Sequence, residues 1–255
     1  MEQAKAITIG GHQISLNSGP KASTIQFHTH ASSIASVGTD NGVEIYSIEK
    51  SASVISLVSK GASKQHAWSP LSGSQLVSHS AANVVSIYDP RGSADAQLDI
   101  TTSFQSNRPS YSAFLDDATL IATGTTSTTR TRTLRLFDIR SPATPKLTVP
   151  FDSSSSPSLS LVPFVDTARR LVYIAQTHSS SLYAFDLNES NPVPITLHLP
   201  STIVAASLLP SQKADVMRAE INRVFVLTSR DEIVPVSVRI ERKVNFILHG
   251  AGANV

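Results

Sequence analysis

The sequence contains no cysteine, so disulfide frameworks, thiolate zinc sites and cysteine nucleophiles are excluded. A chain without cysteine fits a reducing compartment. The sequence also has no run of about 18 apolar residues, the length that a membrane-spanning helix needs. Its first residues, MEQAKAITIGGHQ, lack the basic start and the apolar core of a signal peptide. These absences predict a soluble cytoplasmic protein without a transmembrane segment.

Charged residues are few and nearly balanced in number. Of the 255 residues, 16% are charged and 40% are hydrophobic, and 21 Lys and Arg stand against 19 Asp and Glu. A net charge of +2 without a dense basic tract argues against a nucleic-acid partner. The length and the hydrophobic content are sufficient for the core of one large β domain or of two small ones.

The sequence also lacks the common catalytic patterns. It holds no HExxH zinc motif, no Walker phosphate loop, no GxSxG elbow and no GxGxxG. Asp116 and Asp117 are adjacent and would point to opposite faces of a strand, so we interpret them as part of a turn. His28 and His30 have a spacing that suits a metal, but no third ligand stands nearby. The sequence therefore predicts neither an enzyme nor a cofactor.

Four segments of the chain resemble one another, and this repetition decides the predicted architecture. Each alternates polar and apolar residues up to an aromatic residue, and three of them place Asp directly after it. The aromatics stand 42, 49 and 48 residues apart, a spacing typical of β-propeller blades with four short strands. The segments are GTDNGVEIYSI (38–48), AANVVSIYDPRG (81–92), TRTLRLFDIRS (131–141) and SSSLYAFDLNE (179–189), and their aromatics are Tyr46, Tyr88, Phe137 and Phe185.

The aromatic residue followed by Asp resembles the Trp-Asp dipeptide of WD repeats. A four-stranded blade cannot bury both of its faces alone, so stacking on the next blade supplies the core. Tyr or Phe keeps a large packing surface in that core. We expect Asp89, Asp138 and Asp186 to accept hydrogen bonds from a turn or from a histidine of the same blade. His30 and His66 stand in the right region for two blades, but ordinary surface or packing roles explain them equally well.

Three longer segments match successive parts of one known family of propellers. The first, HAWSPLSGSQLVSHSAANVVSIYDPRG (66–92), ends in the Asp-Pro-Arg of residues 89–91. The second, NRPSYSAFLDDATLIATGTTSTTRTRTLRLFDIRS (107–141), opens on Arg-Pro and closes on a strand of the Trp-Asp type. The third, PSLSLVPFVDTARRLVYIAQTHSSSLYAFDL (157–187), carries a Pro-Phe-x-Asp turn and an aromatic strand. In this order they are similar to parts of coronins, which are WD-repeat proteins that bind actin filaments.

A fourth segment, LLPSQKADVMRAEINRVFVLTSRDEIVPVSVRIERK (208–243), continues the resemblance to coronins. It resembles a stretch that is typical of the family, with the pattern Pro-x-x-x-x-Asp-Val, Glu-Ile-x-Arg-Phe, Leu, Glu-Pro and Pro-Arg-Lys. The whole resemblance covers about residues 14–243 and is more specific than a generic WD repeat. The matching residues of this segment are Pro210, Asp215, Val216, Glu220, Arg223, Phe225, Leu227, Pro235, Arg242 and Lys243.

The resemblance implies an all-β, WD-repeat-type β-propeller that is incomplete beside the seven blades of coronins. We expect about five blades in a partial propeller at residues 1–243 and a divergent C-terminal tail at residues 244–255. The first coronin blade, with basic residues thought to touch actin, and the C-terminal coiled coil are expected to be missing. A truncated isoform, a mis-spliced gene model and a fragment all fit this expectation.

The segment KADVMRAEINRVFVL (213–227) has the pattern of a short helix that leads into a strand. Asp215 suits the N-cap of a helix over residues 215–223. Apolar residues spaced by four and three positions would form a stripe along this helix. We interpret the helix as a brace at the outer edge of a blade, with a binding surface as the alternative. The stripe consists of Met217, Ile221 and Val224. The outer side of the helix would consist of Arg218, Glu220 and Arg223.

The run TSTTRTRTLR (126–135) combines hydroxyl and basic residues. In a strand, Arg130 and Arg132 share one face and Arg135 lies on the other. One interpretation is a basic rim of the propeller in which these three arginines contact a partner. The other is a solvated edge strand that its charge protects from pairing.

Two functions are compatible with these observations. The resemblance to coronins implies a protein that binds filamentous actin, and other cytoskeletal proteins, through propeller surfaces. Such a protein would organise actin filaments in the cytoplasm and associate with the cytoskeleton. The alternative is a WD-repeat scaffold, a trafficking adaptor or a truncated fragment that has lost actin binding.

Overall fold

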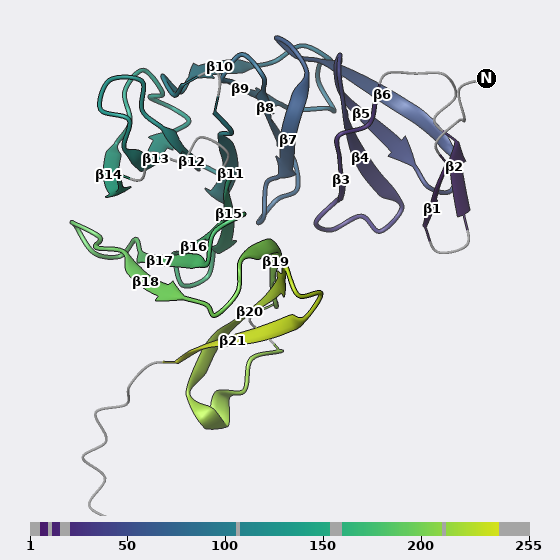
Figure 1. Cartoon of the computed structure of the whole chain (residues 1–255). Coiled ribbons are helices and arrows are strands. Elements are labelled where there is room, and N and C mark those ends of the chain that lie inside the picture. The colour runs from purple at the N-terminus through teal and green to yellow at the C-terminus, as the bar shows by residue number, and fades with distance from the viewer. Residues whose placement is uncertain are drawn as a thin grey trace, which may run out of the picture.

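Sheets of short strands follow one another around an open arc (Figure 1). A computed structural model describes residues 6–9, 12–15, 21–105, 108–153, 160–210 and 213–239. Each strand pairs antiparallel with the strand next to it in the sequence, as expected when tight turns join short strands. Four sheets have four strands and a fifth has three, so the prediction of an all-β chain with about five blades is confirmed.

We number the blades along the chain, and within each blade the order in space is the order in the sequence. The first blade contains β3 (Thr24–Phe27), β4 (Ile34–Thr39), β5 (Gly42–Ser47) and β6 (Ala52–Val58), and the second contains β7 (Ser63–Trp68), β8 (Leu76–Ser80), β9 (Val84–Tyr88) and β10 (Leu98–Thr101). The third contains β11 (Tyr111–Asp116), β12 (Thr119–Thr125), β13 (Arg132–Asp138) and β14 (Leu147–Asp152).

The remaining strands complete the two last blades and a separate hairpin. The fourth blade contains β15 (Leu161–Asp166), β16 (Leu171–Gln176), β17 (Ser181–Asp186) and β18 (Ile195–His198). The fifth contains β19 (Ile203–Leu208), β20 (Glu220–Thr228) and β21 (Ile233–Arg239). Before the first blade, β1 (Ala6–Ile9) pairs with β2 (His12–Ser15) in a two-stranded sheet.

The hydrophobic core lies between neighbouring blades. The first strands of successive blades contact one another, so these strands lie on the inner side of the arc. Each of the four junctions between blades has its own cluster of buried apolar side chains. This agrees with the predicted stacking, in which one blade buries the face of the next. Representative pairs are Ile45 with Trp68, Ile87 with Phe137, Leu134 with Phe185, and Tyr173 with Val224.

The four repeated aromatics occupy equivalent places in these blades. Each lies in the third strand, and all four are buried. Stacking of sheets needs a large side chain at this position, and the regular spacing in the sequence reflects that need. They are Tyr46 in β5, Tyr88 in β9, Phe137 in β13 and Phe185 in β17.

The predicted helix over residues 215–223 is wrong in extent. Only one turn of 3-10 helix forms, at Val216–Arg218, and β20 begins at Glu220. From there the side chains alternate between buried and half-buried positions, which is the period of a strand. Met217 is 92% exposed, so the predicted apolar stripe does not form. Asp215 does cap the turn, because its Oδ1 accepts from the N–H of Met217 at 3.1 Å.

The predicted boundary at residue 243 and the tail at 244–255 lie outside the described residues. The matching residues Arg242 and Lys243 lie outside them as well. No helix in the described part of the chain is both long enough and apolar enough to cross a membrane.

Candidate interaction face

The two faces of the arc carry different side chains. Strands alternate in direction, so the turns after the first and third strands of a blade emerge on one side, and the other connections emerge on the opposite side. We call the first side the charged face and the second the hydroxyl face. The charged face comprises residues 28–33, 48–51, 69–75, 89–97, 117–118, 139–146, 167–170, 187–194, 209–210 and 213–219. The hydroxyl face comprises residues 40–41, 59–62, 81–83, 102–105, 108–110, 126–131, 177–180, 199–202 and 229–232.

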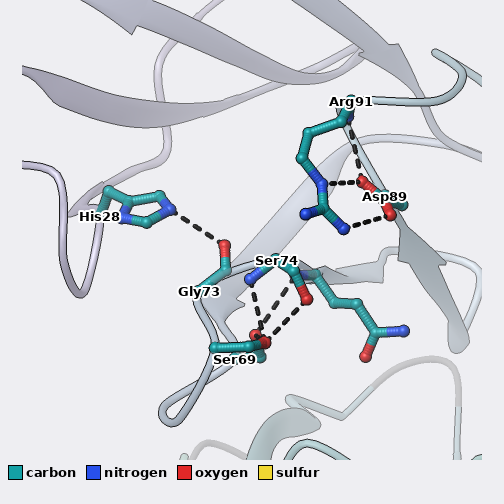
Figure 2. Close-up of polar contacts among 8 residues, drawn as sticks. His28, Ser69, Gly73, Ser74, Asp89 and Arg91 are labelled. Atoms are coloured by element: carbon teal, nitrogen blue, oxygen red, sulfur yellow. Dashed lines mark hydrogen bonds and ion pairs between the residues drawn. The ribbon is translucent and has the colours of Figure 1, made fainter.

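Two histidines of the first blade hold the second blade at the charged face. The Nε2 atom of His28 donates to the carbonyl of Gly73 at 2.9 Å, as Figure 2 shows, and Nε2 of His30 lies 2.8 Å from the carbonyl of Leu71. The Nδ1 atom of His28 accepts from the backbone N–H groups of His30 and Ala31. Both ring nitrogens of His28 therefore have hydrogen-bond partners, in the neutral tautomer with the proton on Nε2.

Gly73 is the residue that this junction requires. Its φ angle of +65° lies in the left-handed region, which favours glycine. A Cβ atom at this position would stand 2.6 Å from Cε1 of His28, closer than carbon atoms approach. Within the β7–β8 turn, the Oγ of Ser69 accepts from the N–H of Gln75 at 3.2 Å.

Adjacent aspartates continue this chain of contacts from the second blade to the fourth. Asp117 Oδ1 accepts from the N–H of Leu71 at 3.1 Å, and Asp116 Oδ2 pairs with Arg170 at 3.0 Å. Burial raises the pKa of Asp116, but hydrogen bonds from Ala118, Thr119 and Arg170 outweigh burial, and the net shift is downward. Asp116 ends β11 and Asp117 lies in the turn, so the predicted turn is confirmed.

A buried polar cluster joins the fourth and fifth blades. The Nδ2 atom of Asn222 donates to Asp166 Oδ2 and to the hydroxyl oxygen of Tyr173, both at 2.9 Å. The same carboxylate pairs with Arg169 at 3.0 Å. Asp166 and Asn222 are buried, so this carboxylate depends on these partners for its solvation. The contacts from His28 to Asn222 thus link all five blades along the charged face.

Three third strands end in a turn that an aspartate caps. Asp89 Oδ1 accepts from the N–H of Arg91 at 3.1 Å, and Asp138 Oδ1 accepts from the N–H of Arg140 at 3.0 Å. The sequence left two donors open for these aspartates, a backbone N–H of a turn or a histidine, and the structure has the N–H of the turn. The guanidinium group of Arg91 also donates hydrogen bonds to the Asp89 carboxylate, from Nε at 2.9 Å and from Nη2 at 2.8 Å (Figure 2). Hydrogen bonds from each arginine lower the pKa of the aspartate that it contacts.

Glu220 organises the start of β20. Its carboxylate pairs with Arg223 at 2.7 Å and accepts hydrogen bonds from Ser237 and from the N–H of Asp215. These contacts, led by that of Arg223, lower the pKa of Glu220 to about 2. The prediction placed Glu220 and Arg223 on the outer side of a helix, but Glu220 is 3% exposed. Of the coronin-like residues, Glu220 and Arg223 therefore form a structural ion pair, and Asp215 joins it through its backbone N–H.

Neutral groups join the first two blades in the interior between the two faces. The indole N–H of Trp68, at the charged-face end of β7, donates to Ser36 Oγ at 3.0 Å, and His66, nearer the hydroxyl face, lies between Thr24 Oγ1 at 2.9 Å and the carbonyl of Ser36 at 3.2 Å. His66 thus binds the neighbouring blade and not the aspartate of its own blade. Burial lowers the pKa of His66 to about 4, so the ring is neutral at pH 7.

A second buried histidine repeats this chemistry at the next junction. His79 Nε2 lies 2.9 Å from Ser110 Oγ, which donates onward to Asn83. Burial is the main cause that lowers the pKa of His79 to about 4. Further along the arc, Thr123 donates to the carbonyl of Leu161 at 2.7 Å. These contacts between blades use uncharged donors and acceptors, and the guanidinium group of Arg135 adds a charged donor between the second and third blades.

The three candidate arginines of the predicted basic rim do not lie together. Arg130 is exposed in a turn of the hydroxyl face. Arg132 is 1% exposed and pairs with Asp152 at 2.5 Å. Arg135 reaches the carbonyl of Thr102 and lies over the ring of Phe104, 4.9 Å from its centroid. The interpretation as an edge strand is also corrected, because β13 is the third strand of a four-stranded sheet. Partner contact by Arg130 stays a prediction.

A cavity of about 810 Å³ opens at the inner side of the arc, beside the charged face. Its walls come from the first, second, fourth and fifth blades, because the arc curves around it. Apolar residues such as Leu71 and Leu208 alternate with Gln26, Asp166 and Asn222 along the wall. The carboxylate of Asp166 is already committed to Arg169 and Asn222.

A comparison with solved structures decides what this arc of blades is. The chain is similar to the crystal structure of the WD40 domain from Toxoplasma gondii coronin, with a TM-score of 0.81 over 91% of this chain. The chain has the WD40 β-propeller fold. The sequences are 20% identical, so the likeness concerns the fold, and the match spans 59% of the coronin chain. The coronin resemblance predicted from the sequence is thus confirmed at the level of the WD40 fold.

The sequence comparisons add no relative to this structural likeness. No protein-family model matches the chain, and no curated protein matches it in sequence. The WD40 fold positions Tyr88, Phe137 and Phe185 as the repeat predicted. Sequence reasoning missed the contacts between blades, such as Asn222 with Asp166, which are 56 residues apart. In the sequence, the one sign of the contact at Asn222 is a polar residue at a position of β20 where the alternation of the strand turns the side chain into the core.

Proposed function

We propose that this chain binds filamentous actin and helps to organise actin filaments, as coronins do. The binding would use surfaces of the propeller, without catalysis and without a cofactor. The observation that supports this most is the ordered series of coronin-like segments on a WD40 fold like that of a coronin domain. A cytoplasmic, cytoskeleton-associated location belongs to the same proposal, and other cytoskeletal proteins are further candidate partners.

The geometry supports a role in protein contact. WD40 blades present short, well-anchored turns on two faces, and such rigid turns suit recognition of another protein surface. The described residues contain no group of three or more His, Cys, Asp or Glu that could hold a metal ion. The carboxylates Asp116, Asp166 and Glu220 are each engaged in ion pairs that hold the fold. Binding is therefore the function that the exposed groups favour.

Co-sedimentation with filamentous actin tests the proposal. The purified chain is incubated with filaments at low and at moderate salt and then pelleted, and a parallel sample without filaments controls for aggregation. A saturable increase of the chain in the pellet is expected. If the chain stays in the supernatant at both salt concentrations, actin binding is ruled out.

The second candidate is a WD-repeat scaffold or trafficking adaptor that does not bind actin. The exposed apolar side chains at the two ends of the arc favour it. Phe27 on β3 is 52% exposed and Val204 on β19 is 46% exposed, and both suit contact with another chain. This candidate predicts no pelleting with filaments together with a monomeric, cooperatively unfolding chain.

A further inference from the structure

Three equivalent turns of the charged face differ in one side chain. In the second and third blades the turn reads Asp89-Pro90-Arg91 and Asp138-Ile139-Arg140. In the fourth blade the residue in the place of the arginine is Asn188, and its N–H donates to Asp186 Oδ1 at 2.9 Å. The backbone contact is the same in all three blades. The aspartate therefore makes the turn, and the turn forms without an arginine.

The two arginines are fixed and yet open to solvent. The side chain of Arg91 is 72% exposed and that of Arg140 is 79% exposed. Each contacts its aspartate through Nε and Nη2, and neither Nη1 atom has a hydrogen-bond partner among the described residues. Exposed ion pairs of this kind contribute little to stability. Fold stability therefore gives no reason for these two guanidinium groups.

We propose that Arg91 and Arg140 form a two-point binding site for carboxylates on the surface of an acidic protein partner. This inference rests on the proposed function, because the actin filament is the partner we assign to the site. The aspartate holds each guanidinium plane in one orientation, so binding loses little side-chain freedom. The free Nη1 edge is aimed at solvent and suits a second carboxylate in an end-on geometry.

Charge complementarity selects an acidic partner. A guanidinium group has five N–H donors and no acceptor, so its remaining donors need an oxygen ligand, and carboxylate gives the stronger hydrogen bond. Because Asp89 and Asp138 offset the charges, the contact is short-ranged and depends on geometry. Two neighbouring blades repeat the same group, so a partner that offers paired carboxylates engages both at once.

The test compares a double variant of each face. R91Q/R140Q removes the two guanidinium groups from the charged face and keeps the aspartates that cap the turns. K60Q/R230Q removes two exposed cationic side chains from the hydroxyl face, where Lys60 is paired with Asp99 as Arg91 is with Asp89, and serves as the matched control. Thermal unfolding of both variants first confirms that the fold is intact. Binding is then measured to filamentous actin by co-sedimentation and to immobilised poly-L-glutamate at low salt.

The two probes separate failure of the inference from failure of the proposed function. The inference expects R91Q/R140Q to bind poly-L-glutamate about tenfold more weakly than the wild type, and K60Q/R230Q to bind as the wild type does. Equal binding of R91Q/R140Q and the wild type to poly-L-glutamate overturns the inference, whatever actin does. If only the filaments fail to bind, the proposed function is lost while the carboxylate site stands.

Asn188→Arg supplies a gain-of-function test. It places a third arginine at the equivalent turn of the fourth blade, beside Asp186. The expected result is binding to poly-L-glutamate that is a few-fold tighter than that of the wild type. Unchanged or weaker binding of this variant counts against a site made of turn arginines.

Discussion

The charged face and the hydroxyl face join the same blades by different chemistry. On the charged face the carboxylates of Asp116 and Asp166 pair with arginines that remain partly exposed to water. On the hydroxyl face the neutral rings of His66 and His79 bind hydroxyl groups in the buried interior. A buried charge without partners is costly, whereas a neutral donor or acceptor needs one hydrogen bond. The main contacts between blades therefore differ: ion pairs whose arginines reach water join them on the charged face, and buried neutral groups join them on the hydroxyl face, where Arg135 and the ion pair of Arg132 are charged exceptions.

The comparison predicts a selective sensitivity of the hydroxyl face to acid, which is the largest effect expected. His66 and His79 have a pKa of about 4 in the folded chain against 6.5 in the unfolded chain. The unfolded state therefore binds protons first, so stability is fully present above pH 6.5 and is lost as the pH falls toward 4. At pH 5 we expect each histidine to cost about 2 kcal/mol.

Urea unfolding at pH 7.5 and pH 5 measures this loss. The variant His66→Gln removes one of the two titrating groups and should lose about half of the pH dependence. Identical unfolding midpoints of the wild type at the two pH values would contradict the neutral, buried state of these rings.

Removal of a carboxylate from the charged face gives the next largest effect. Asp166→Ala leaves Arg169 and the buried Asn222 without their acceptor. We expect a loss of about 3 kcal/mol in the free energy of unfolding. Asp186→Ala is the control, because Asp186 is exposed and its carboxylate accepts hydrogen bonds from Asn188 alone among the described residues. Equal destabilisation by both substitutions would mean that the contact between the fourth and fifth blades is not special.

Two glycines, one near each face, differ in the space that is available to an added Cβ atom. A Cβ atom on Gly124, near the hydroxyl face, would stand 2.6 Å from ring carbons of Phe104. Gly124→Ala should therefore destabilise the chain by about 1–2 kcal/mol. On the charged face, the nearest atom to such a Cβ on Gly92 is the Asp89 carbonyl oxygen at 3.8 Å, so Gly92→Ala should be neutral. Melting temperatures of the two variants test this contrast, which fails if Gly92→Ala is the more harmful.

The smallest effect is expected for the exposed arginines. Arg91→Gln and Arg140→Gln should leave the melting temperature unchanged, because the turn of the fourth blade forms with Asn188 in the same place. A clear fall in melting temperature for either variant would show that the arginine supports the fold. In that case fold stability would explain the two guanidinium groups, and they would not indicate a binding site.

Much of the fold could be predicted because blades repeat locally. The alternation of side chains is a property of neighbouring residues, so Tyr88 and Phe137 marked the third strands correctly. The prediction of a helix around Glu220 was wrong because polar residues occupy inward positions of β20. Glu220 and Asn222 are buried where a strand pattern would show apolar residues, so the spacing of Met217 and Ile221 suggested a helix instead.

The candidate site was harder to predict than the blades. Arg91 stood out only as part of the Asp-Pro-Arg that resembles coronins, and Arg140 had no signal of its own. Arg91 and Arg140 prove equivalent only when the turns after the third strands are compared between blades, where Asn188 takes the place of the arginine in the fourth blade. The run from Arg130 to Arg135 looked more basic in the sequence. Packing between sheets buries Arg132, and no local pattern reports that.

Zero-length carbodiimide cross-linking to filamentous actin identifies the face that binds the filament, because it joins lysines to carboxylates in contact. Lys50, Lys146 and Lys213 are exposed on the charged face, and Lys60 and Lys64 are exposed at the hydroxyl side of the arc. The account predicts cross-links from the first group, which mass spectrometry would identify. Cross-links confined to Lys60 and Lys64 would contradict it, because the filament would then lie on the face without the paired arginines.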